Sequence, residues 1–160
     1  KAYAMTGWRI GYAGGPEWLI SAMTNIQSQS TSNPTSISQV AAEAALNGDQ
    51  NCIEPMIKAF RARHEYVVTR LKQIQGLNCL PATGAFYAFA DARSAITTLY
   101  KKNILRSPDD ISFSEYLLNN AGVAVVPGSA FGTEGYMRLS FATSLENLRN
   151  ALDRIARALD

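Results

Sequence analysis

Lys1-Ala2-Tyr3-Ala4-Met5-Thr6-Gly7-Trp8-Arg9-Ile10-Gly11 opens the 160-residue chain and decides its fold. In this stretch a lysine precedes an arginine by eight positions, with Thr6-Gly7 between them. Glycines interrupt a helix here, and a fully extended run would leave Lys1 and Arg9 roughly 26 Å apart. A turn at Thr6-Gly7 would instead let both cationic groups approach one ligand. The spacing therefore indicates a reaction centre rather than a core segment.

The same stretch closely resembles the lysine site of the class I, fold type I, pyridoxal-phosphate aminotransferases. That motif runs lysine, two free positions, a small residue, an apolar one, a free one, a small one, a free one, arginine, an apolar residue, and Gly or Ala. Every position from Lys1 to Gly11 fits it. In that family the lysine carries pyridoxal 5'-phosphate as an aldimine and the arginine binds its phosphate. The resemblance implies that Lys1 is catalytic and cofactor-binding, and that Arg9 is cofactor-binding.

The family motif extends a few residues upstream of the lysine, where this sequence has none. We therefore expect the chain to be the C-terminal part of a longer enzyme, most like the bacterial aspartate enzymes. The family's aspartate to the pyridine nitrogen, its tyrosine to the cofactor O3′ and its ring-stacking aromatic also lie upstream. None of these three groups can be assigned to a residue of this sequence.

A second arginine lies in a strand-like stretch, Tyr136-Met137-Arg138-Leu139-Ser140-Phe141-Ala142. Its strict alternation places three apolar residues on one face and points Arg138 away from them. The stretch resembles the family's carboxylate-binding arginine region and is followed by Thr143-Ser144 and a final helix, as in that family. The resemblance implies that Arg138 binds the substrate α-carboxylate. An isolated strand arginine is otherwise usually a surface charge.

Two further stretches are similar to family segments. Thr83-Gly84-Ala85-Phe86-Tyr87 resembles a strand that borders the substrate pocket, which makes Gly84 a substrate-binding candidate, although a β-turn leading into a buried strand explains it nearly as well. The run Pro127-Gly128-Ser129-Ala130-Phe131-Gly132 has two glycines that suggest a phosphate cradle. It lacks the spacing of a phosphate-binding glycine motif, so a loop is the better interpretation.

The expected fold class is α/β, with the end of the aminotransferase large domain at 1–50, a long connecting helix at 51–75 and a mixed α/β small domain at 76–160. Apolar periodicity and turn signals predict each element. The expected helices are about 16–29, a second one ended by Gly48, 51–75, 110–120 with a capping box at Ser112–Glu115 and an end at Gly122, and a last one capped by Ser144. The expected strands are 8–13, 77–80, 85–90, 123–126 and 136–142.

A polar segment, Ser28-Gln29-Ser30-Thr31-Ser32-Asn33-Pro34, separates the first two helices. It resembles a Ser-Asn-Pro stretch that lies near the subunit interface and the neighbouring cofactor phosphate in aspartate-type aminotransferases. The alternative is a solvated loop in which Asn33 caps the second helix.

The single histidine and the two cysteines suggest no chemistry of their own. His64 lies beside the apolar stripe between Phe60 and Val68 with no recognisable partner, which favours a half-buried packing role. Cys52 and Cys79 match no metal-ligand spacing and are interpreted as buried, reduced thiols, with a single bridge left open.

Composition excludes several classes of protein. The chain is 47% apolar and 18% charged, as in ordinary globular proteins, and its 15 basic and 13 acidic residues form no basic run. We therefore expect no nucleic-acid partner. No apolar stretch is long enough to span a bilayer, so no membrane role is expected. A cytoplasmic location follows from the family resemblance.

The resemblance implies transamination between an L-amino acid, with aspartate expected, and a 2-oxo acid, in a full-length homodimer. Enzymes for alanine, aromatic amino acids or prephenate share these motifs and remain alternatives. A different class of function is a non-catalytic structural fragment, because essential groups lie upstream. We expect the isolated 160-residue chain to be inactive.

Overall fold

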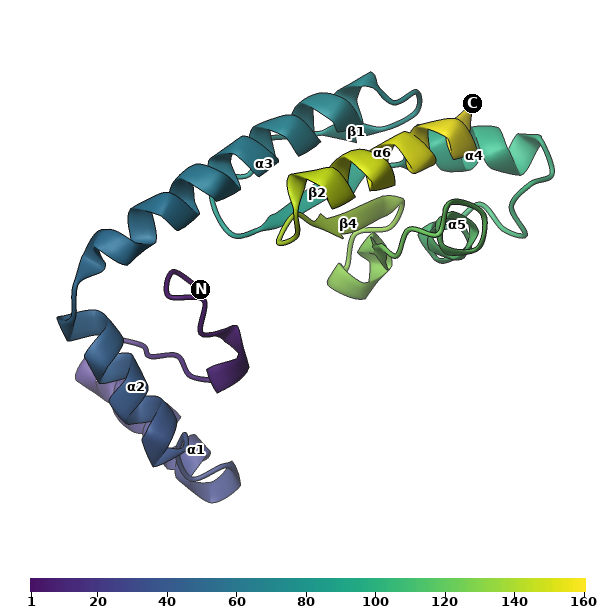
Figure 1. The fold of residues 1–160 in the computed structure, drawn as a ribbon. Coiled ribbons are helices and arrows are strands. Elements are labelled where there is room, and N and C mark those ends of the chain that lie inside the picture. Colours follow the sequence, from purple (N-terminus) through teal and green to yellow (C-terminus); the bar gives the residue numbers. More distant parts are fainter. The chain divides into compact units, whose positions relative to one another are not determined.

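The computed structural model describes all 160 residues, and the chain divides into two compact units, Lys1–Ile57 and Lys58–Asp160. The first is the N-terminal unit and the second is the C-terminal unit. Together they contain helices and one antiparallel sheet, which confirms the expected mixed α/β fold (Figure 1). None of the helices combines the length and the apolar character needed to cross a membrane.

The N-terminal unit is helical. Its elements are the 3-10 helix η1 (Thr6–Trp8), α1 (Glu17–Ser30), α2 (Ser36–Asn47), the 3-10 turn η2 (Gln50–Cys52) and the start of α3 (Ile53–Gln73). Both predicted helices before residue 50 are confirmed, and α2 ends where Gly48 donates its N–H to the Ala44 carbonyl at 2.9 Å. The N-cap position of α2 is Thr35, so the prediction of Asn33 is wrong.

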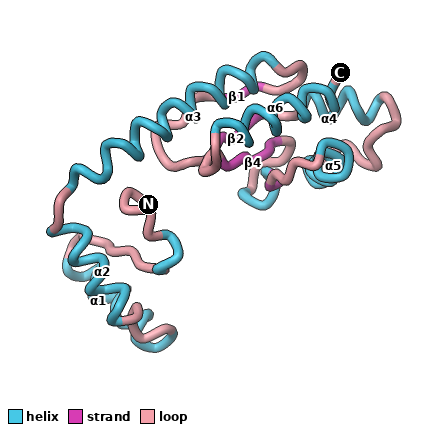
Figure 2. Tube along the Cα trace, viewed as in Figure 1, coloured by secondary structure: helices cyan, strands magenta, loops and turns pink.

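The predicted strand at 8–13 is wrong. Trp8 ends η1, Arg9 has a left-handed φ of 51°, and residues 9–16 form the loop drawn in pink before α1 in Figure 2. A strand needs a neighbour to satisfy its backbone N–H and C=O groups. The four strands of the sheet all belong to the C-terminal unit, and none pairs with this segment.

The N-terminal unit buries almost nothing. Ser38 is its only buried residue. Apolar side chains on both helices are instead in contact with solvent: Trp18, Ile26 and Ile37 are each 72% exposed. A helical pair with apolar outer faces cannot be stabilised by a core of its own.

The C-terminal unit contains the sheet, with β1 (Asn78–Cys79), β2 (Tyr87–Asp91), β3 (Val126–Pro127) and β4 (Tyr136–Ser140) in the order β1-β2-β4-β3. Every neighbouring pair is antiparallel, and β2 pairs with β4 so that Phe89 lies opposite Arg138. The predicted pairing of 77–80 with 85–90 is confirmed in shorter form. The buried strand expected at 123–126 is reduced to the half-buried β3, because it lies at the edge of the sheet.

Four helical segments complete this unit beside α3: α4 (Arg93–Lys101), α5 (Asp110–Tyr116) continued by the π-helical turn η3 (Leu117–Ala121), the 3-10 helix η4 (Gly128–Phe131), and α6 (Leu145–Leu159). α3 and α6 lie on one side of the sheet (Figure 1). The core lies between these helices and the sheet. Its most deeply buried apolar side chains include Val67, Leu71, Phe113, Met137, Leu152 and Ile155.

The helix ends show which signals were correct. Asp109, not Ser112, is the N-cap of α5, so the predicted capping box is wrong, because its residues already lie inside the helix. Gly122 ends this segment with a φ of 60°, as predicted. Ser144 caps α6 by accepting the Asn147 N–H at 3.1 Å, also as predicted.

His64 has the packing role predicted for it. Its Nε2 accepts the Ala82 backbone N–H at 3.0 Å, and its ring centroid lies 5.5 Å from that of Phe141. The two cysteines differ from each other. Cys79 is buried, and burial raises the pKa of its thiol, whereas Cys52 is exposed, so the prediction of a buried Cys52 is wrong. Cys52 lies in η2, in the unit that lacks a core, and both thiols are free.

Candidate functional site

The lysine-to-arginine stretch folds as two successive turns. The Lys1 carbonyl accepts the Ala4 N–H at 3.0 Å, and the Met5 carbonyl accepts the Trp8 N–H at 3.1 Å. The second turn is η1, which contains the Thr6-Gly7 pair, so a turn lies where the sequence predicted one. A turn here shortens the separation of the two basic residues relative to an extended chain.

Arg9 lies at a cavity of about 550 Å³ within the N-terminal unit. Its Nη1 donates to the Thr6 carbonyl at 3.2 Å, which holds the guanidinium against the turn. The cavity is lined by Ala4, Gly7, Trp8, Arg9, Thr35 and Ser38. Lys1 is outside this lining, and its side chain is exposed.

A chain of two hydrogen bonds attaches the start of α2 to this turn. Thr35 Oγ1 donates to Ser38 Oγ at 2.9 Å, and Ser38 Oγ donates to the Trp8 carbonyl at 2.8 Å. Ser38 is buried by this arrangement. The cavity is therefore lined by the Arg9 guanidinium, which has N–H donors beyond the one used by Thr6, and by two hydroxyl groups whose hydrogens are already donated within the chain. The remaining guanidinium donors suit a phosphate group, which accepts several hydrogen bonds and binds Arg in a fork.

Arg138 lies between two aromatic rings in the C-terminal unit. Its guanidinium carbon is 4.3 Å from the ring centroid of Tyr87 and 4.3 Å from that of Phe131. Both distances are within the range of cation–π attraction. No ion pair in the structure uses Arg138. Ring contacts of this kind use no N–H donor, so the N–H groups of Arg138 stay suited to a carboxylate, which they bind as a fork.

The rings belong to an aromatic face of the sheet, on the side opposite the core. This aromatic face consists of Tyr87, Phe89, Phe131 and Tyr136, with Phe89 stacked on Tyr136 at 5.1 Å and edge-on to Phe131 at 6.3 Å. Sequence reasoning missed it. The available signal was the alternation of both strands. Every second residue of β2 and β4 is buried, so the residues between them share the opposite face of the sheet.

An ion pair lies at one end of this face. Arg93 binds both carboxylate oxygens of Asp91, with Nη2–Oδ2 at 2.6 Å and Nε–Oδ1 at 3.0 Å. These bonds lower the pKa of the Asp91 carboxyl, and the same carboxylate raises the pKa of Arg93. The Arg93 guanidinium also lies 5.4 Å from the ring centroid of Tyr136. Arg93 is thus already paired with an acid, unlike Arg138.

Gly84 lies in the exposed segment that precedes β2. A Cβ added at this position would meet no atom within 4 Å, so nothing in this unit requires a glycine there. The segment 127–132 is not a phosphate cradle by its local geometry. It begins with β3 and continues as η4, and Gly128 is needed because a Cβ would meet the Thr133 carbonyl oxygen at 2.3 Å.

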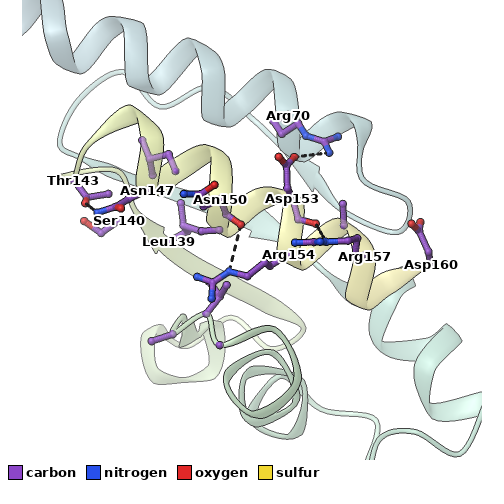
Figure 3. A pocket seen from close by; sticks show the side chains of 16 residues that line it. Arg70, Leu139, Ser140, Thr143, Asn147, Asn150, Asp153, Arg154, Arg157 and Asp160 are labelled. Atoms are coloured by element: carbon purple, nitrogen blue, oxygen red, sulfur yellow. Dashed lines mark hydrogen bonds and ion pairs between the residues drawn. The ribbon is translucent and has the colours of Figure 1, made fainter.

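The larger cavity of the C-terminal unit, about 1010 Å³, contains none of the predicted site residues. Figure 3 shows its charged side chains along α6 and the facing part of α3. They interact with each other: Arg70 pairs with Asp153 at 3.0 Å, and Arg157 donates to the Asp153 carbonyl at 3.3 Å. These basic groups are already engaged, so we place no chemistry there.

Comparison with known proteins identifies relatives along nearly the whole chain. The family model described as aminotransferase class I and II matches residues 1–155. An aspartate/prephenate aminotransferase of Nitrosomonas europaea is 64% identical over 159 residues, which is 99% of this chain and 40% of the relative. An aspartate aminotransferase of Rhizobium meliloti is 51% identical over 160 residues, or 100% of this chain and 39% of the relative.

Solved structures agree with this match. The crystal structure of the Rhizobium meliloti aspartate aminotransferase is similar with a TM-score of 0.83 and 48% identity, covering 100% of this chain and 40% of that one. An aromatic aminotransferase from Pyrococcus horikoshii is similar with a TM-score of 0.81 and 39% identity, covering 99% and 40%. The chain thus spans about 40% of the length of the relatives that it matches.

Proposed function

The chain belongs to the class I and II aminotransferases, and from this we propose that the protein of which it forms a part transfers an amino group from an L-amino acid to a 2-oxo acid. The observation that carries the proposal is the geometry around Arg9. The turn after Lys1 holds at a cavity a guanidinium whose remaining N–H groups can bind a cofactor phosphate as a fork. Enzymes of this family use pyridoxal 5'-phosphate.

The residues of the N-terminal unit fit that cofactor at its phosphate end. Arg9 would bind the phosphate through two N–H groups, and Thr35 Oγ1 lies on the same cavity as a further polar group. When bound, pyridoxal 5'-phosphate supplies an aldehyde that accepts an amino group and a conjugated ring that draws electrons from the substrate Cα.

Lys1 would hold the cofactor covalently through Nζ. The same nitrogen would also move the proton between the substrate Cα and the cofactor C4′. General acid–base catalysis of this kind requires an amine within hydrogen-bond reach of both atoms. Lys1 is therefore the proposed catalytic residue.

Arg138 would bind the substrate α-carboxylate. Its guanidinium has no acidic partner within the chain, and two aromatic rings hold it in place. A carboxylate is the planar anion that such a fork binds best. Gly84 is retained only as a pocket-bordering residue, because it offers a backbone segment next to β2 and no side chain.

Aspartate is the proposed amino acid, with prephenate as a second acceptor, because both occur in the name of the 64% identical relative. Enzymes for alanine or aromatic amino acids are the alternatives, and the structural likeness to an aromatic aminotransferase supports keeping them. A role for the 160 residues on their own is a separate proposal. Since Ser38 is the only buried residue of the N-terminal unit, we expect the 160 residues alone to be inactive and to act at most as a structural fragment.

For the whole protein we propose a cytoplasmic homodimer. The N-terminal unit would be the end of a large cofactor domain to about residue 50, residues 51–75 the connecting helix and 76–160 the small domain. The exposed apolar residues of α1 and α2 support a covered surface in the assembly. The balanced charge supports small acids as partners rather than nucleic acid.

The test is Lys1→Ala in the full-length protein, measured as aspartate-dependent transamination and as the visible absorbance of the bound cofactor. We expect both to be lost. Lys58→Ala, in α3, is the matched control and should keep both. Normal turnover in the Lys1 variant would end the proposal.

A further inference from the structure

The aromatic contacts of Arg138 come from two parts of the C-terminal unit that are distant in sequence. Tyr87 is the first residue of β2, and Phe131 is the last residue of η4. Each ring centroid lies 4.3 Å from the guanidinium carbon. A guanidinium in contact with two rings loses rotational freedom about its side chain, so the direction of its N–H groups is restricted before a ligand arrives.

Phe131 does not owe its position to burial, because it is 47% exposed. The short helix that carries it is instead fixed by a buried acid. Asp110, at the start of α5 and 2% exposed, accepts the Ser129 backbone N–H on Oδ2 at 2.6 Å. A charge-assisted bond to a backbone N–H is stronger than a neutral one, and removing it would leave a buried carboxylate without that donor.

Two glycine features complete the attachment of η4. Gly132 ends it with a φ of 75° and donates its N–H to the Ser129 carbonyl at 3.0 Å. Gly128 begins it where the backbone passes too close to Thr133 and Tyr136 for any side chain. The single helical turn that carries Phe131 is therefore held at its start by the close packing of Gly128 and at its end by the Gly132 hydrogen bond. The Asp110 bond to Ser129 lies between these two points.

We propose that Phe131, held in place by Asp110, is a positioning residue that fixes the plane of the Arg138 guanidinium for the substrate carboxylate. The inference rests on the proposed role of Arg138 as the carboxylate-binding group. Tyr87 is the second ring in contact with the same guanidinium. Asp110 touches neither substrate nor cofactor in this scheme and acts only through Ser129 and Phe131.

The test uses the full-length protein loaded with cofactor and compares Phe131→Leu with Phe131→Tyr. Leu removes the aromatic face, whereas Tyr keeps it. We expect Phe131→Leu to raise KM for both amino acid and 2-oxo acid, and the Kd for succinate as a non-reacting carboxylate, by about twofold to thirtyfold, as loss of one cation–π contact predicts. kcat should change much less, and Phe131→Tyr should resemble the unmodified protein.

Tyr100→Leu is the matched control, because Tyr100 is 44% exposed and lies on α4, away from Arg138. Phe131→Met is the second variant; it fills similar space without a ring and should show the same rise in KM. Unchanged KM in both Phe131→Leu and Phe131→Met, or an equal rise in Tyr100→Leu, would overturn the proposal.

Asp110→Asn tests the anchor. Its effect on KM should be smaller than that of Phe131→Leu, and the double variant should be no worse than Phe131→Leu alone, because both act through one contact. Additive effects would remove Asp110 from the scheme. Arg138→Lys separates this inference from its premise: unchanged KM there would refute the carboxylate role itself, whereas a raised KM with no effect at Phe131 would refute only the positioning.

Discussion

Asp109 accepts the backbone N–H of Ser112 on Oδ1 at 2.7 Å, and this bond begins α5. Its second oxygen accepts the hydroxyl hydrogen of Ser107. The Ser107 bond first and the Ser112 bond second lower the pKa of the Asp109 carboxyl. The charged form is thus the one that the fold favours.

Asp109→Ala should lower the free energy of unfolding of the C-terminal unit by about 1 kcal/mol at neutral pH, because the N-cap of α5 is lost. A carboxyl whose pKa is lowered in the folded state stabilises above its unfolded pKa of about 3.9, and this contribution is lost as pH falls through the folded value. Urea unfolding from pH 7 downward should therefore show the two proteins converging in acid. A difference that grows in acid would contradict the assignment.

Tyr116→Phe should cost about 0.5–1.5 kcal/mol, the usual contribution of one hydrogen bond. The Tyr116 hydroxyl donates to the Ala158 carbonyl at 2.7 Å and so ties α5 to the end of α6. Thermal unfolding measures the loss, and Tyr100→Phe is the control, since that side chain is exposed. Equal melting temperatures for Tyr116→Phe and the unmodified protein would show that the bond contributes nothing.

Leu152→Ala should destabilise by about 2–5 kcal/mol, because its side chain is fully buried and the change leaves a cavity between α6 and the sheet. Leu118→Ala removes the same atoms from a side chain that is 53% exposed and should cost far less. Urea titration of both variants compares the two sites directly. Similar losses would mean that Leu152 is not part of the packed core.

Arg9→Gln should weaken retention of pyridoxal 5'-phosphate by the full-length protein by about tenfold or more, because charged hydrogen bonds contribute about 1.5–3 kcal/mol each. Arg9→Lys keeps the charge but cannot bind the phosphate as a fork. Its retention of the cofactor should lie between those of the unmodified protein and Arg9→Gln. Equilibrium dialysis of the cofactor measures the effect, and Arg61→Gln, on the exposed side of α3, is the control. Undiminished retention in Arg9→Gln would remove Arg9 from the cofactor site.

Local patterns predicted the parts of the fold that local physics decides. The alternation around Arg138, the caps at Gly122 and Ser144 and the helix at 51–75 all depend on spacing that the sequence displays. The error at 8–13 has the opposite cause. Strand formation depends on a neighbouring strand, which no window of apolar residues can reveal.

The missed helix α4 and the misplaced cap of α5 have different causes. α4 is absent from the prediction although Ala95, Ile96 and Leu99 have helical spacing. α4 has only 9 residues, and periodicity is a weak signal for so short a segment. The N-cap of α5 was predicted at Ser112 because Ser112–Glu115 has capping-box spacing. The Ser112 N–H instead donates to the side chain of Asp109, which is the residue that caps the helix.

The sequence predicted site residues only where a single contiguous motif contains them. Lys1, Arg9 and Arg138 come from contiguous stretches that resemble the family. The rings at Tyr87 and Phe131 could not be found this way, because they meet Arg138 only after β2, β4 and η4 have assembled.

The alternation of β4 has a consequence for chain length. Met137 and Leu139 face the core while Arg138 faces the aromatic rings, so removing or adding one residue within Tyr136–Ser140 would exchange the two faces for all residues beyond the change. Arginine would then enter the core and a core residue would replace it between the rings. This strand should accept substitutions of similar size far more readily than any indel, and engineered insertions belong in the exposed turn at Thr133–Glu134 instead.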